Sequence, residues 1–95
     1  MANSIGKTSW ILDTEGEITT APVYITSIQW VGYAASEIGD GHICQLLDKA
    51  AGTEVFYRKA TGITEGFTQE YPGGIRVDGL YLNDLDSGKI IVSIK

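Results

Sequence analysis

Residues 22–33 read Pro-Val-Tyr-Ile-Thr-Ser-Ile-Gln-Trp-Val-Gly-Tyr, and this stretch decides what kind of fold the chain can form. It is rich in β-branched and aromatic residues and carries no charge. Such residues suit the pleated, half-buried surface of a sheet. We therefore expect a central strand here, with the remaining strands laid in sequence beside or across it.

Both faces of this predicted strand carry apolar side chains. A strand that is apolar on both sides is usually covered on both sides, by a second sheet and by a loop or a partner. Strict alternation of side chains divides the apolar residues into two sets. These are Val23, Ile25 and Val31 on one face, and Tyr24, Ile28 and Trp30 on the other.

The rest of the chain divides into shorter extended segments bounded by glycine, proline or aspartate turns. Segments 42–48 and 54–60 predict one hairpin, and segments 79–83 and 89–95 predict another, with alternate aliphatic residues pointing inward. Residues 72–74, Pro-Gly-Gly, predict a turn between two short strands. The other expected strands are 7–13, 18–20, 67–71 and 75–78.

These segments amount to about seven or eight short strands, and no window keeps the 3.6-residue apolar period of a helix. The pattern predicts an all-β fold, a compact antiparallel β-sandwich or jelly-roll-like barrel. The 95 residues are enough for one domain, 1–95, in which residues 1–8 are a candidate N-terminal arm.

Composition excludes several classes of function. The net charge of −5 and only seven scattered Lys and Arg residues argue against binding to nucleic acid. The single cysteine, Cys44, cannot form a disulfide within the chain, which argues against a secreted disulfide scaffold. No apolar run is long enough to cross a bilayer, and the first residues do not resemble a signal peptide. We expect synthesis in a cytoplasm.

The motifs that could carry chemistry are incomplete. Gly6-Lys7-Thr8 matches only the end of a phosphate-binding loop, because Met1 stands where the motif needs its first glycine. Leu12 to Gly16 faintly resembles the loop of retroviral aspartic proteases, but Glu15 stands in place of the glycine. Asp84 to Gly88 begins like a calcium loop, yet the later glutamate ligand is missing, so a hairpin turn explains it better.

His42 and Cys44 are the sole histidine and cysteine. Zinc needs three or four ligands, and a Cys-His nucleophile pair needs a third group to orient it. We interpret Cys44 as a core residue and predict no catalytic residue, no metal site and no cofactor.

The aromatic residues offer one alternative, a platform on which a sugar could stack. Most of them should fill the core of a small β-sandwich. We expect Tyr33, Tyr71 and Tyr81 to be the exposed ones, because they flank glycine turns or oppose core positions.

Several segments together resemble a type of short structural protein of tailed bacteriophages. They are 23–32, 41–48 with Gly52 and 55–57, 79–82, and 85–94. The resemblance covers most of the chain from Pro22 onward. It implies a β-sandwich that serves the phage particle as a capsid decoration or cement protein, or as a small head-tail or fibre component.

The resemblance thus implies a non-enzymatic virion protein that binds copies of itself and a larger protein such as the major capsid protein. The N-terminal arm could pair with a neighbour at a sheet edge. A carbohydrate-binding or host-attachment module of a fibre is the alternative, and an acid protease is a third reading. The candidate interaction residues are Ile5, Trp10, Tyr33, Tyr71 and Tyr81.

Overall fold

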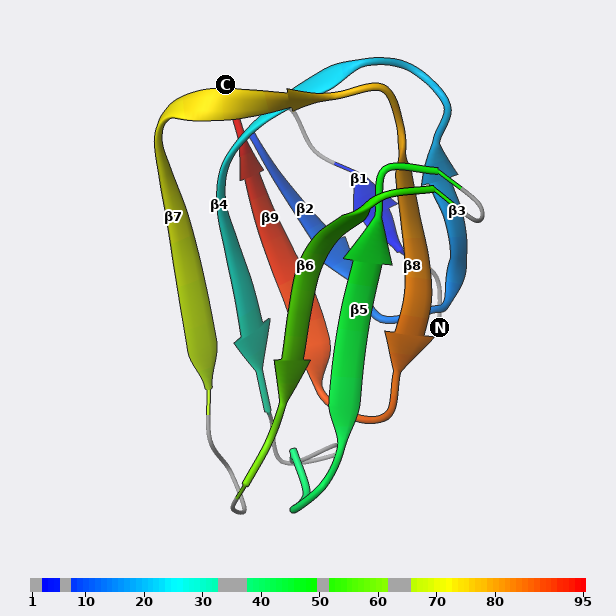
Figure 1. Cartoon of the computed structure of the whole chain (residues 1–95), viewed down its shortest axis with the longest axis vertical. Helices are drawn as coiled ribbons and strands as arrows, with labels where there is room; N and C mark the ends of the chain where they lie inside the picture. Colours follow the sequence, from blue (N-terminus) through cyan, green and yellow to red (C-terminus); the bar gives the residue numbers. More distant parts are fainter. Residues whose placement is uncertain (1–2, 6–7, 33–37, 50–51, 62–65) are drawn as a thin grey trace.

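The computed structural model describes residues 3–5, 8–32, 38–49, 52–61 and 66–95. This part of the chain holds nine strands and no helix (Figure 1). The strands are β1 (Ser4–Ile5), β2 (Ser9–Leu12), β3 (Gly16–Thr19), β4 (Val23–Val31), β5 (Ile43–Leu47), β6 (Glu54–Lys59), β7 (Phe67–Val77), β8 (Leu80–Leu85) and β9 (Lys89–Ile94).

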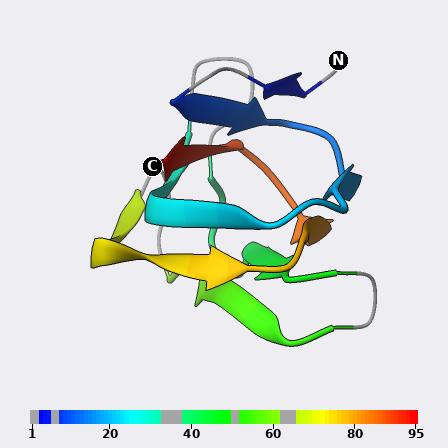
Figure 2. The same cartoon turned by 90° about the horizontal axis from the view of Figure 1, so that it is seen from above.

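The strands form two antiparallel sheets that pack face to face. The five-stranded sheet has the order β1-β2-β9-β4-β7, and the four-stranded sheet has the order β3-β8-β5-β6. Seen from above, β1 lies at the outer edge beside β2 (Figure 2). The predicted all-β sandwich is confirmed, but β4 does not occupy the middle of its sheet, which is taken by β9.

The pairing of the strands is nested. β2 pairs with β9, β3 with β8, β4 with β7 and β5 with β6, so that each pair encloses the next one along the chain. The chain is therefore one long folded-over ribbon whose pairs alternate between the two sheets. This wrapping is the arrangement of a jelly roll.

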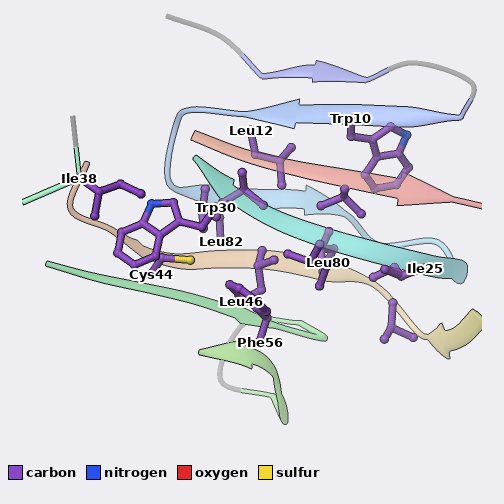
Figure 3. Close-up of a cluster of buried hydrophobic side chains, with 14 of the residues drawn as sticks. Trp10, Leu12, Ile25, Trp30, Ile38, Cys44, Leu46, Phe56, Leu80 and Leu82 are labelled. Carbon is purple, nitrogen blue, oxygen red and sulfur yellow. The ribbon is translucent and has the colours of Figure 1, made fainter. Parts of the chain in front are cut away.

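The core lies between the two sheets and receives side chains from both (Figure 3). The inward positions predicted on the last two strands, Leu80, Leu82, Ile90 and Val92, are fully buried, and Ile94 is partly buried. On β2, Trp10 and Leu12 point inward as expected from their alternation. Burial of such aliphatic and aromatic surface is the main term that stabilises a domain of this size.

The prediction that strict alternation places Ile25 on the face opposite Ile28 and Trp30 is wrong. Its pairing with both neighbours shifts register between Ile25 and Ser27, which is a β-bulge at Thr26. The extra residue changes the phase of the alternation. Ile25 therefore points to the same side as Ile28 and Trp30, and all three are fully buried.

The Pro72-Gly73-Gly74 segment does not separate two strands as predicted. β7 continues through it, from Phe67 to Val77, and bends sharply there (Figure 1). Opposite the single residue Thr26, β7 carries the four residues 71–74. Gly73 and Gly74 have φ of 81° and 85°, which makes the bend possible.

The predicted C-terminal hairpin is also corrected. β8 and β9 belong to different sheets, so residues 86–88 form an arch that crosses the core. Inward alternation is the same for a hairpin on one sheet and for two strands that face each other, which is why the pattern did not distinguish them. The other predicted hairpin, β5 with β6, is confirmed.

The N-terminal arm pairs with its own chain. β1 lies antiparallel to β2. The Asn3 side chain holds the start of the arm, since its Oδ1 accepts from the backbone N–H of Asp13 at 2.7 Å and of Thr14 at 2.9 Å. In this structure the arm covers the β2 edge of the sheet.

Candidate functional site

A pocket lies where β7 bends away from β4. The bend arises because four residues of β7 face one residue of β4, so the backbone of β7 leaves the sheet. The pocket has a volume of about 400 Å³. It is lined by Thr26, Glu70, Tyr71, Pro72, Gly73 and Lys95.

Tyr71 is one of the lining residues, but its side chain packs against the core between the two sheets, and its hydroxyl group is already engaged. The hydroxyl donates a hydrogen bond to the carbonyl oxygen of Val55 on β6, at 3.2 Å. Partial burial raises the pKa of Tyr71, although the nearby positive charge of Arg58 opposes this rise. The bond joins the edge strands of the two sheets and fixes the ring.

The polar groups around the pocket differ in how they are satisfied. Thr26 Oγ1 donates to the carbonyl oxygen of Ser93 at 3.2 Å, and Lys95 Nζ donates to that of Gly73 at 3.4 Å. Glu70 is exposed at the rim. These groups offer hydrogen-bonding atoms of both kinds at an open depression of the surface.

A buried polar cluster closes the opposite end of the sandwich. His42 Nδ1 and Ser87 Oγ lie 2.7 Å apart, and the backbone N–H of Gly39 donates to the same Nδ1 at 3.1 Å. Trp30 Nε1 donates to the carbonyl oxygen of Ser87 at 2.8 Å. A serine beside a histidine is the start of a nucleophilic pair. Ser87 is almost fully buried, however, so we interpret the cluster as a fastening of the β8–β9 arch.

Three carboxylates surround this arch. Glu15 accepts from the backbone N–H of Leu85 at 2.7 Å, and Asp86 accepts from that of Ile43 at 2.9 Å. The pKa of Asp84 is raised to about 6, mainly by desolvation, then by its hydrogen bond with Asp86 and by the charges of Asp86 and Glu15. Within the described residues, no group of His, Cys, Asp and Glu is arranged to hold a metal ion.

Cys44 points into the core beside Trp30 (Figure 3). Burial, followed by the charge of Asp84, raises the pKa of its thiol to about 12. The thiol therefore stays protonated and unreactive at neutral pH, which agrees with its interpretation as a core residue.

The outer faces of the two sheets differ in charge. Two rows of paired residues on the five-stranded sheet place uncharged side chains at the centre of its outer face, and one of these rows ends at the edge strand β7 in the charged Glu70. The four-stranded sheet instead presents the carboxylates of Glu17, Glu54 and Asp84. We define the uncharged face as Ser9, Ile11, Ser27, Gln29, Thr68, Ile91 and Ser93.

Of the predicted interaction residues, the structure brings only Ile5 and Trp10 together among those it describes. Trp10 is a core residue with only 7% of its surface exposed, because the alternation of β2 points it inward. Ile5 pairs with Trp10 through the backbone of β1. Tyr71 lines the pocket, Tyr81 lies half-buried on β8, and Tyr33 is outside the described residues.

The large apolar side chains that are most exposed were not among those candidates. They are Tyr24, Ile11 and Tyr57, with 50%, 40% and 39% of their surface exposed. Alternation around Trp10 and Leu12 already places Ile11 on the outer side, so the sequence contains the signal for this residue. The pocket depends on the register of β4 against β7, which the sequence does not reveal.

Comparisons with family models, with curated proteins and with solved structures give no match. In the described part of the chain, no helix has the length and apolar character needed to span a membrane.

Proposed function

We propose that the protein is a non-enzymatic structural component of a tailed-bacteriophage particle, a capsid decoration or cement protein. In this role it resides in the virion, associates with copies of itself and docks on the major capsid protein. The proposal starts from the resemblance of the sequence to small phage structural proteins. The jelly-roll wrapping is compatible with it, since viral capsid proteins and lectins both use this architecture, but fold alone does not define function.

The observation that carries the proposal is the uncharged face of the five-stranded sheet. In a chain with a net charge of −5, its seven residues carry no charge and Ile11 pairs with Ile91, while the carboxylate of Glu70, paired with Ser27, lies at its β7 edge. Two acidic molecules can approach through such a face without strong repulsion, whereas the carboxylates of the four-stranded sheet would oppose contact.

The size of the molecule fits a face-to-face contact. A standard interface buries about 800 Å² on each partner. The accessible surface of the chain is 5209 Å², so one such contact would cover roughly a seventh of it.

The test is co-sedimentation of the purified protein with the heads of the phage that encodes it, combined with light scattering of the free protein. Ile11→Asp places a charge on the uncharged face and should weaken binding to the heads by roughly tenfold or more. Tyr57→Asp is the matched control, because Tyr57 is equally exposed but lies on the four-stranded sheet. It should bind like the unmodified protein.

Failure of the unmodified protein to associate with heads, together with a monomer at high concentration, would contradict the proposal. Equal weakening by both variants would show that the uncharged face is not the contact.

A further inference from the structure

We infer that His42 is a pH-dependent switch, whose neutral ring holds Gly39 and the adjacent Ile38 in place and whose protonated ring releases Gly39. This device goes beyond docking on a particle and does not rest on it. The inference combines the hydrogen bonds of one ring nitrogen, the close contact of the ring with Gly39 and the burial of Ile38.

The ring belongs to a tight turn, residues 39–42, that the backbone closes. The backbone N–H of His42 donates to the carbonyl oxygen of Gly39 at 3.1 Å. Gly41, the third residue of the turn, has φ of 80°, a value that favours glycine. Two further backbone bonds of 2.8 Å join Gly41 and His42 to Ala60, the residue after β6. The His42 end of the turn is therefore anchored without the help of the ring.

The hydrogen bonds define which ring nitrogen carries the proton. The backbone N–H of Gly39 donates to His42 Nδ1 at 3.1 Å. A nitrogen that accepts this bond carries no hydrogen of its own, so the ring is neutral and its single proton is on Nε2. Ser87 Oγ lies 2.7 Å from the same Nδ1 and then acts as a second donor to it.

The ring is in close contact with Gly39. A Cβ added at Gly39 would lie 2.8 Å from Cε1 and 3.1 Å from Nδ1 of His42, which is closer than atoms of this kind pack. Glycine is therefore the residue that leaves room for the ring. The same closeness means that a change at Nδ1 acts directly on the Gly39 backbone.

Ile38 joins this turn to the core at the arch end of the sandwich. Its side chain is fully buried and lies beside the indole of Trp30 (Figure 3). A Cβ added at Gly88 would lie 3.1 Å from Ile38 Cγ1, so Ile38 also packs against the arch. Since Gly39 follows Ile38 directly, the bond to the ring restrains the backbone next to a core side chain.

A second proton on the ring removes the acceptor of Gly39. An imidazolium has an N–H on both nitrogens and no free lone pair in the ring plane. Its Nδ1–H can donate to the hydroxyl oxygen of Ser87, but it faces the N–H of Gly39, donor against donor. Gly39 must then move away from the ring and find water, because a donor left without an acceptor is costly.

Charged groups around the ring set the pH of this change rather than its occurrence. Carboxylates favour the charged ring and ammonium groups oppose it. On the turn and on the segments around the arch, these groups are Glu15, Asp40, Lys59, Asp84, Asp86 and Lys89. None of them gives the Gly39 N–H another acceptor, since Gly39 N bonds only to Nδ1 among the described contacts.

The experiment is a pH titration of the full chain by NMR between about pH 8 and about pH 5, the range in which an imidazole ordinarily gains its second proton. At the upper end, ring ¹⁵N shifts should show the proton on Nε2. As the ring C–H signals titrate, the Gly39 amide should shift with the same midpoint. Its exchange with water, corrected for the intrinsic effect of pH, should rise by roughly tenfold, the factor expected for loss of one hydrogen bond. The Gly41 amide, which bonds to Ala60, should keep its protection.

Variants separate the ring from the carboxylates. In His42→Asn, Oδ1 is as many bonds from Cα as Nδ1 and accepts a hydrogen bond without titrating, so Gly39 should stay protected across the range. In His42→Phe the acceptor is absent, so Gly39 should exchange fast throughout. Asp84→Asn is the matched control, because the pKa of Asp84 is raised to about 6 and its titration falls in the same range. This control should keep the Gly39 transition unchanged.

The inference is overturned if the ring carries its proton on Nδ1 at the upper pH, or if the Gly39 amide does not follow the ring. It is also overturned if the transition persists in His42→Asn or disappears in Asp84→Asn. A dispersed spectrum shows that a variant is folded, and the titration of the unmodified chain decides the question if a His42 variant is not. Failure here leaves docking of the uncharged face on phage heads untouched, because His42 is not part of that face.

Discussion

The two ends of the sandwich differ in how tightly they are packed around their glycine-containing segments. At the arch end, the β8–β9 connection is fastened by Trp30, His42 and the carboxylates, and Gly88 fits directly against the backbone of Val31. At the bend end, β7 departs from β4 and leaves an open pocket. Both ends contain glycines with positive φ, yet one end is filled and the other is hollow.

This difference separates two reasons for a glycine, a positive φ of the backbone and a lack of space for a side chain. A positive φ favours glycine at both ends. Only at the arch end does the space around the glycine also exclude a side chain. Stability should therefore depend far more on the arch end than on the bend end.

Substitution of the two glycines should give the largest contrast. At Gly88 an added Cβ would overlap the carbonyl oxygen of Val31, while at Gly73 it would meet nothing within 4 Å. Gly88→Ala should lower the free energy of unfolding by roughly 2–5 kcal/mol, from overpacking and backbone strain together. Gly73→Ala carries only the strain and should cost roughly 1–2 kcal/mol.

Urea denaturation measures both glycine variants. Equal losses of stability would break the comparison, because they would mean that the arch end tolerates a side chain as well as the open bend does.

Trp30→Phe sharpens the comparison at the filled end. The change removes the hydrogen bond from Nε1 and leaves the carbonyl of Ser87 without this donor in a buried place. It also leaves a small cavity beside Cys44. We expect a loss of roughly 2–3 kcal/mol in the free energy of unfolding, read from the urea midpoint. A loss below about 1 kcal/mol would show that the arch does not depend on this bond.

Tyr71→Phe makes the equivalent change at the open end. It removes the hydrogen bond to the carbonyl of Val55, but this carbonyl belongs to an edge strand that water can reach. The expected loss is about 0.5–1.5 kcal/mol. Thermal unfolding of this variant and of Trp30→Phe compares the two ends directly. A larger loss of stability for Tyr71→Phe would contradict our assignment of the arch end as the more stabilising one.

Substitution of Asp84 should have the smallest effect on stability, and this effect should depend on pH. The pKa of Asp84 is raised to about 6 in the folded protein, whereas an unfolded chain has about 3.9. Between these values the folded state binds more protons, so the contribution of Asp84 to stability is complete below about pH 4 and is lost as the pH rises through about 6. Asp84→Asn should therefore show a smaller decrease in urea midpoint between pH 4 and pH 7 than the unmodified protein.

Identical pH profiles for the two proteins would contradict the assignment of this titration to Asp84. Asp48→Asn is a suitable control, because its carboxylate lies at the turn between β5 and β6, away from the arch.

The sequence predicted the strands and the inward positions well where alternation is unbroken. β8 and β9 are examples, since Leu80, Leu82, Ile90 and Val92 follow a strict period of two and are all buried. The sequence failed where an extra residue changes the phase. Nothing in Ile-Thr-Ser marks Thr26 as a bulge, because the bulge is set by the partner strand.

The candidate site was harder to predict than the fold. Tyr71 was expected to be exposed because a glycine turn follows it, and the structure places it half-buried, with its side chain packed against the core. The lining combines residues of β7 itself with Thr26 on β4 and Lys95 just after β9, which are distant in sequence. A site assembled from three strands has no local spacing that a single sequence can show.

The nested pairing of the strands has a consequence for biosynthesis. The outermost of the nested pairs joins residues 9–12 to residues 90–93, almost the full span of the chain. Contacts between such distant residues slow folding, because a long loop must be ordered before they form. The five-stranded sheet cannot be completed on the ribosome until β9 has emerged from the exit tunnel, so the nascent chain must stay soluble with its apolar strands exposed until then.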